Sequence, residues 1–287
     1  MPNTLSPPRN LSRRGLLVSL SAAALPVFAK TGNVEIGVCG SVENFEKAEQ
    51  WGFDYYEPAV AAVAALSDAD FSAFSKRVLA SRIRCKRFNS FIRSGVVVGP
   101  NVNKDALTAY MNSALDRCRE LGASIIVWGS AGSRNVPDGY SRDLAWEQIK
   151  TFLHYAGDIA GARNLIVAIE PLRKQESNII NTGAEALRLV HEVNHPHVKM
   201  IIDYYHLRVE KEDPDILRKA RAEIVHLHFA NPTGRRWPRS EDEDPVYREF
   251  FQTVKQVDYR GGLSIEGQGT FEADATASLA FFKQELS

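Results

Sequence analysis

The sequence has little of what marks several classes of protein. Its cysteines, Cys39, Cys85 and Cys118, are odd in number and have no CxxC spacing, which excludes a disulfide framework and a zinc knuckle. Basic residues are not in excess, with 35 basic against 35 acidic, and no basic stripe is visible, so nucleic acid is not expected as a partner. A Gly/Ser-rich linker is also lacking, and 287 residues therefore predict one domain behind a short leader.

The leader comprises residues 1–29, which carry three arginines and no acidic residue, and which end in an uncharged run over residues 15–29. That run is shorter than the ~20 residues of a membrane-spanning helix, and its end suits signal peptidase, so it predicts a signal peptide rather than an uncleaved anchor. The Arg13-Arg14 pair is typical of a twin-arginine signal. We therefore expect export to a periplasmic compartment and no membrane contact after the leader is removed.

Strand and helix signals alternate through residues 30–287, and this alternation predicts a parallel sheet covered by helices. Eight such units need roughly 250 residues, so the expected fold is α/β, a single (β/α)8 TIM barrel. Predicted strands cover residues 34–39, 53–58, 83–91, 124–128, 165–170, 198–203, 224–229 and 263–266. Predicted helices cover residues 42–50, 68–80, 104–121, 144–162, 183–193, 213–222, 246–257 and 273–285. Residues 59–65 fit either helix or loop.

Four of these strands end in a residue that can bind a metal ion: Glu170, Asp203, His228 and Glu266. Because the carboxyl ends of the strands meet at one rim of a barrel, we expect these side chains to lie together. Three carboxylates and one imidazole suit a hard or borderline divalent ion such as Mn²⁺, Mg²⁺ or Co²⁺, with positions left for substrate oxygens. One such residue alone would indicate a salt bridge, whereas four favour a metal site. His226 alternates with His228, so both can face the barrel interior.

Several motifs extend this pattern over most of the chain. They are Gly52–Pro58, Glu170–Glu176, Asp203–His206, His226–His228 and Ser264–Gly267. Together they resemble the xylose isomerase-like TIM-barrel superfamily, and within it the sugar phosphate isomerase/epimerases and ketose 3-epimerases.

The resemblance implies roles for particular residues. It matches Glu170 and Glu266 to the pair that exchanges protons with the substrate from opposite faces. It matches His206 to a residue that hydrogen-bonds substrate oxygens, and Glu176 to an acid behind the ligands. Mn²⁺ is the usual ion of that family, with Mg²⁺, Co²⁺ or Zn²⁺ as alternatives. The family's metal ligands correspond to Glu170, Asp203, His228 and Glu266, with His226 as their neighbour.

Two departures from the ketose 3-epimerase pattern fall where a substrate is held. Those enzymes have an arginine six residues after the ligand histidine, whereas this chain has Gly234 followed by Arg235. After the first glutamate they have Asn-Arg, whereas this chain has Arg173-Lys174. Arg235 therefore either holds a sugar oxygen or phosphate or belongs to a solvated loop, and Trp128 is a candidate for stacking on a substrate.

The expected function is a divalent-metal-dependent isomerase or epimerase that removes a proton beside a ketose carbonyl and passes through an enediolate. The alternative is a 3-keto-glycoside lyase or hydrolase with the same first step, in which Tyr204, Tyr205 or Trp128 stacks on the aglycone. A non-catalytic sugar-binding protein is a weaker alternative, because binding alone does not need a proton-transfer pair. An apurinic-site endonuclease would need many more zinc ligands. The expected partner is a small sugar or keto-sugar, and a homo-oligomer stays open.

Overall fold

A computed structural model describes residues 34–93 and 95–287, so the predicted leader over residues 1–29 lies outside the described residues. The described chain forms one sheet of eight strands in the order β2-β1-β8-β7-β6-β5-β4-β3, and every neighbouring pair is parallel. Bridges from Tyr56 to Cys85 and from Ala59 to Asn89 join its two edges. The strands are β1 (Glu35–Gly40), β2 (Tyr55–Pro58), β3 (Arg87–Phe88), β4 (Ile125–Trp128), β5 (Ile166–Ile169), β6 (Val198–Asp203), β7 (Ile224–Phe229) and β8 (Gly262–Ile265).

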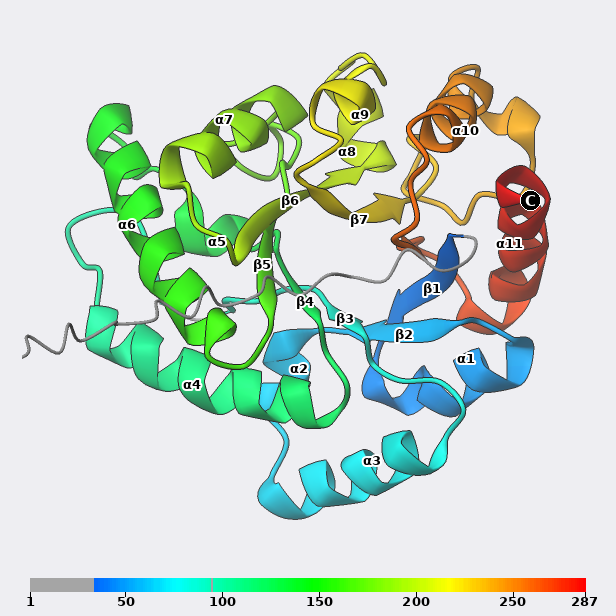
Figure 1. Cartoon of the computed structure of the whole chain (residues 1–287), viewed down its shortest axis with the longest axis horizontal. Coiled ribbons are helices and arrows are strands. Elements are labelled where there is room, and N and C mark those ends of the chain that lie inside the picture. Colours follow the sequence, from blue (N-terminus) through cyan, green and yellow to red (C-terminus); the bar gives the residue numbers. More distant parts are fainter. Residues whose placement is uncertain (1–33, 94) are drawn as a thin grey trace, which may run out of the picture.

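Helices surround this sheet, and Figure 1 shows the strands at the centre with helices around them. The larger helices are α1 (Phe45–Trp51), α3 (Asp68–Ala80), α4 (Lys104–Glu120), α6 (Arg142–Gly161), α7 (Gly183–Val193), α10 (Tyr247–Gln256) and α11 (Phe271–Leu286). The short ones are α2 (Val60–Ala64), α5 (Ala131–Arg134), α8 (Tyr204–Val209) and α9 (Ile216–Lys219). The predicted TIM barrel is therefore confirmed, and no helix of the described part is long and apolar enough to cross a membrane.

Polar side chains fix where several helices begin. Ser67, Asn103, Ser141 and Thr182 each accept a hydrogen bond from a backbone N–H in the first turn of α3, α4, α6 and α7. Such caps satisfy donors that have no partner inside the helix. The predicted bounds of these helices agree with the structure to within three residues for this reason.

The third strand is much shorter than predicted. It is reduced to Arg87 and Phe88. The charged side chain of Arg87 is buried and needs a partner of opposite charge. The buried Arg87 pairs with Glu35 at 2.9 Å, and its guanidinium carbon lies 4.1 Å from the centre of the Tyr55 ring. These contacts hold the segment inside the barrel without long ladder pairing. Of the two possibilities for residues 59–65, the structure shows the helix, α2.

The barrel interior has an apolar part and a polar part. Ile125, Val127, Ala168 and Ile201 form a small apolar cluster separate from the large core beneath the helices. Fully buried polar groups fill the region between β2, β7 and β8, where Glu57, His226, His228 and Ser264 are hydrogen-bonded to one another. His228 belongs both to this polar part and to the predicted metal ligands, so the interior of the barrel is continuous with the site.

Candidate active site

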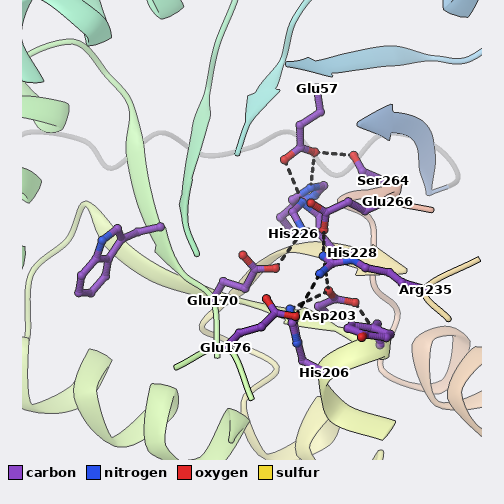
Figure 2. A network of polar contacts seen from close by, with 12 residues as sticks. Glu57, Glu170, Glu176, Asp203, His206, His226, His228, Arg235, Ser264 and Glu266 are labelled. Atoms are coloured by element: carbon purple, nitrogen blue, oxygen red, sulfur yellow. Dashed lines mark hydrogen bonds and ion pairs between the residues drawn. The ribbon is translucent and has the colours of Figure 1, made fainter. Parts of the chain in front are cut away.

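The four predicted ligands converge at the carboxyl ends of the strands. Glu170 follows β5, Asp203 ends β6, His228 lies near the end of β7 and Glu266 follows β8. Each contributes an atom suited to a metal, and these atoms all lie within 4.8 Å of one another. Figure 2 shows the four side chains pointing toward a common centre.

His228 presents its two ring nitrogens to different partners. Its Nδ1 lies 3.1 Å from Oε1 of Glu170 and 3.3 Å from Oε2 of Glu266. Its Nε2 lies 2.9 Å from Oε1 of Glu57 on the other side of the ring. Nδ1 is therefore the nitrogen that faces the carboxylates and could join them around an ion.

Asp203 shows that these residues fit a divalent cation. Its Oδ1 accepts a hydrogen bond from the Tyr205 N–H at 2.8 Å, but its buried Oδ2 has no hydrogen-bond partner. Burial raises the pKa of the Asp203 carboxyl to about 7, opposed by Arg235 and reinforced by the charges of Glu170 and Glu266. A buried carboxylate oxygen without a partner is costly, and a cation held by all four residues would satisfy it.

Arg235 enters the site from the loop after β7. Its Nη2 lies 2.7 Å from Oε2 of Glu266 and 3.6 Å from Oδ2 of Asp203, and its Nη1 lies 3.6 Å from Oε1 of Glu176. Gly234 and Arg235 both have positive φ, +72° and +51°, which turns the loop sharply inward. Arg235 is therefore part of the site rather than of a solvated loop.

The carboxylates and Arg235 also set each other's charge. Burial alone would raise the pKa of Glu266, but Arg235 and then His228 outweigh it and lower that pKa to about 2. Burial likewise would lower the pKa of Arg235, and Glu266 and Asp203 raise it instead. Glu266 is accordingly an ionised carboxylate, as a base needs to be.

His206 and Glu176 lie beside this cluster. Nδ1 of His206 accepts the Arg173 N–H at 3.2 Å, so the neutral ring carries its proton on Nε2. Burial, with Arg235 next, lowers the pKa of His206 to about 2. Nε2 is buried without a hydrogen-bond partner, 3.5 Å from Oδ2 of Asp203, and can donate to a ligand. Glu176 is held by Nε of Arg173 at 2.7 Å.

A cavity of about 330 Å³ opens above these side chains. Its polar lining suits a small molecule rich in oxygen atoms. The lining includes Glu170, Glu176, His206, Arg235, Glu266 and Gln268.

Trp128 is not brought to the cavity, which corrects the expectation that it contacts a substrate. Its side chain is fully buried, lies 5.0 Å from the Phe152 ring centre and donates from Nε1 to Ser133 at 3.2 Å. Side chains alternate along a strand, and Val127 points into the barrel, so Trp128 points outward to α6. The cavity is instead lined by the next residue, Gly129, where a Cβ atom would lie 1.7 Å from Oε2 of Glu170.

Glu57 is the main residue of the site that the sequence analysis did not assign. It is fully buried below the ligands, where burial alone would raise its pKa, but His228 and His226 lower that pKa well below the usual range. The sequence does hold one indication of Glu57: Glu57-Pro58 ends β2, just as Glu170-Pro171 follows β5. His226 faces inward as predicted, with Nε2 2.8 Å from Oε2 of Glu57.

Comparison with known proteins confirms the resemblance. Residues 45–285 match the family model described as xylose isomerase-like TIM barrel, and the chain belongs to that family. It is 28% identical over 179 residues to the 3-dehydro-D-guloside 4-epimerase of Escherichia coli, covering 59% of this chain and 67% of that protein. It is 29% identical over 161 residues to the ketose 3-epimerase of Arthrobacter globiformis, covering 54% and 53%. The matched parts thus span about two thirds and one half of these relatives.

Solved structures agree in fold. The apo 3-keto-D-glucoside 4-epimerase from E. coli superposes with a TM-score of 0.75 at 21% identity, covering 88% of this chain and 99% of that one. A D-psicose 3-epimerase studied in the presence of D-fructose superposes with a TM-score of 0.76 at 20% identity, covering 88% and 99%.

Proposed function

We propose that the protein is a divalent-metal-dependent epimerase or isomerase of a ketose or keto-sugar, and that Mn²⁺ is its ion. The observation that carries this proposal is the convergence of Glu170, Asp203, His228 and Glu266 around a buried carboxylate oxygen without a partner. Membership of the family and the sugar epimerases among its relatives support it.

The residues divide the chemistry between them. When bound, the ion supplies positive charge beside the substrate oxygens, where negative charge develops as a proton leaves the adjacent carbon. Glu170 and Glu266 follow β5 and β8, both line the cavity, and they lie on different sides of His228 (Figure 2). One carboxylate can remove the proton while the other delivers a proton to the opposite face, which inverts the carbon.

Three further side chains would hold the substrate. Nε2–H of His206 is an unused donor at the edge of the cavity and would bond a substrate oxygen. Arg235 lies against Glu266 and would fix an oxygen near the reacting carbon. Glu176, held between Arg173 and Arg235, would accept from a sugar hydroxyl.

A 3-keto-glycoside is the second candidate substrate. The observation that favours it is the likeness to the 3-dehydro-D-guloside 4-epimerase. The proposed stacking of an aglycone finds little support, because Tyr204 is buried against Phe229 and Tyr205 lies 4.8 Å beneath Arg235, measured from its ring centre to the guanidinium carbon. Epimerisation of such a substrate therefore suits the cavity better than cleavage.

Solvent exchange tests these alternatives. Protein stripped with a chelator and reloaded with Mn²⁺ is incubated in D₂O with a panel of ketoses and 3-keto-glycosides. Deuterium at the inverted carbon together with an epimer supports the proposal, and a released aglycone supports the lyase or hydrolase. Saturable sugar binding without any exchange would refute both and indicate a binding protein.

The proposal extends to location. The leader predicts export by a twin-arginine route, and a free sugar or keto-sugar from outside the cytoplasm fits such a place. N-terminal sequencing of the protein from a periplasmic fraction tests it. A mature chain that still begins at Met1 contradicts it.

A further inference from the structure

Glu57 receives contacts from three side chains in the polar part of the barrel. Its Oε1 lies 2.9 Å from Nε2 of His228, and its Oε2 lies 2.8 Å from Nε2 of His226 and 2.5 Å from Oγ of Ser264. Figure 2 shows Glu57 and Ser264 on one side of the two histidines and Asp203 on the other. Glu57 therefore touches the candidate ligand His228 without belonging to the carboxylate cluster.

The contact determines which nitrogen of His228 is free. An ionised carboxylate only accepts hydrogen bonds, so the nitrogen that faces Glu57 must carry a proton. With the proton on Nε2, the lone pair of the neutral ring lies on Nδ1, which points toward Glu170 and Glu266. A metal-binding histidine commonly has its other ring nitrogen fixed by a carboxylate in this way.

The other contacts keep Glu57 in place. Nδ1 of His226 lies 2.9 Å from the carbonyl oxygen of Gly262 and Nε2 faces Glu57, so this ring lies between two acceptors and, when neutral, donates to one of them. Oγ of Ser264 can donate to Glu57 because the Tyr55 hydroxyl, 2.7 Å away, can in turn donate to Ser264. All these groups are buried, where a hydrogen bond is electrostatically stronger than it is in water.

We infer that Glu57 is a positioning residue that orients His228 through Nε2 and thereby makes Nδ1 the metal ligand. The inference rests on the proposed function in one respect, since it requires the site to bind a divalent ion. Glu57 itself does not touch the cavity, and it acts through His228.

Glu57→Gln tests this role with almost no change in shape. A glutamine offers one oxygen and one NH₂ group, so it cannot accept from both histidines, and one Nε2 must lose its bond or become an acceptor. Mutation of such supporting partners typically weakens metal binding by about 10- to 100-fold. We expect a loss in that range when Mn²⁺ is titrated calorimetrically into chelator-treated protein.

Two further variants isolate the effect. Glu223→Gln makes the same change in a carboxylate that pairs with Lys199 at 2.5 Å, away from the site, and should bind Mn²⁺ like the wild type. Ser264→Ala removes the hydrogen bond to Glu57 and the one from the Tyr55 hydroxyl but leaves both histidine contacts, so it should fold and weaken Mn²⁺ binding about threefold. Circular dichroism shows whether Glu57→Gln folds. If it does not, Ser264→Ala still provides a test.

The outcomes separate the two claims. Wild-type protein that binds no divalent ion overturns the proposed function. If folded Glu57→Gln binds Mn²⁺ with the wild-type affinity, only the role of Glu57 is overturned. The same holds if Glu57→Gln is unfolded and Ser264→Ala binds Mn²⁺ with the wild-type affinity. At saturating Mn²⁺ we expect Glu57→Gln to keep the wild-type KM for the sugar, because Glu57 touches no substrate, and a large rise in KM would contradict a role exerted through the metal alone.

Discussion

Replacing Gly129 with alanine should disable the site while leaving the barrel intact. Gly129 follows β4, and its φ does not lie in the left-handed region, so alanine is allowed by the backbone. A Cβ atom there would lie 1.7 Å from Oε2 and 2.8 Å from Cδ of Glu170. The atoms that it meets are the far end of a side chain, so the carboxylate must move and the backbone need not.

The size of the movement sets the size of the effect. Ordinary van der Waals contact begins near 3.4 Å, so the Glu170 oxygen must retreat by roughly 1.7 Å from the added methyl group. A misplacement of about 1 Å in a catalytic arrangement can cost about 100-fold in rate. We therefore expect kcat to fall by at least about 100-fold, with weaker Mn²⁺ binding because Glu170 is also a candidate ligand.

The assay compares Gly129→Ala with Gly132→Ala in the short helix α5 that follows it. A Cβ atom at Gly132 meets nothing within 4 Å, so that variant should retain wild-type deuterium exchange and Mn²⁺ affinity. Both variants should unfold near the wild-type Tm. The reasoning is refuted if Gly129→Ala exchanges deuterium and binds Mn²⁺ as the wild type does.

Other predictions follow from the same geometry. Glu266→Gln should retain the fold and lower solvent exchange by about 100-fold or more, the usual contribution of a general acid or base, and normal exchange would remove Glu266 from that role. Arg235→Gln should lower the Tm of the metal-free protein by a few degrees, because it leaves Glu266 and Asp203 without their nearby guanidinium group. Added Mn²⁺ should restore most of that loss, and an unchanged Tm would contradict the pairing. Mn²⁺ at about 100 times its Kd should stabilise wild-type protein by about 2.7 kcal/mol in a denaturant titration, whereas equal stability with and without Mn²⁺ would argue against a native metal site. Trp128→Phe should cost about 1 kcal/mol of stability through the lost bond to Ser133 and leave KM unchanged, and a raised KM would return Trp128 to the substrate site.

The sequence predicted the barrel and the convergence of the four candidate ligands because both rest on a local rule. A parallel strand ends at the same rim as its neighbours, so Glu170, Asp203, His228 and Glu266 could be brought together without knowing any contact. The inward direction of His226 and His228 also followed from alternation along one strand. Trp128 was misplaced because β4 is buried on both faces, and a continuous apolar run does not reveal which side chains point inward.

Glu57 and Arg235 needed information that is not local. The three partners of Glu57 lie 169, 171 and 207 positions away along the chain, on β7 and β8, which come near β2 only when the barrel is formed. Arg235 reaches the carboxylates because a non-glycine residue adopts positive φ after Gly234, a loop conformation that residue type alone does not indicate. The partner of Arg87 in β3, Glu35, is likewise distant along the chain.

The division of the barrel interior into an apolar and a polar part bears on the order of folding. Ile125, Val127, Ala168 and Ile201 come from β4, β5 and β6, which are neighbours in the sheet and consecutive in the sequence, so they can pack before the ends of the chain meet. Glu57 obtains its partners only when β2, β1, β8 and β7 are side by side, which joins the first and last strands of the sequence. Contacts between such distant segments form slowly, since a long loop must close first. The contacts that support His228 are therefore completed by barrel closure. If the site binds a metal ion as proposed, binding would report that the last strand has docked.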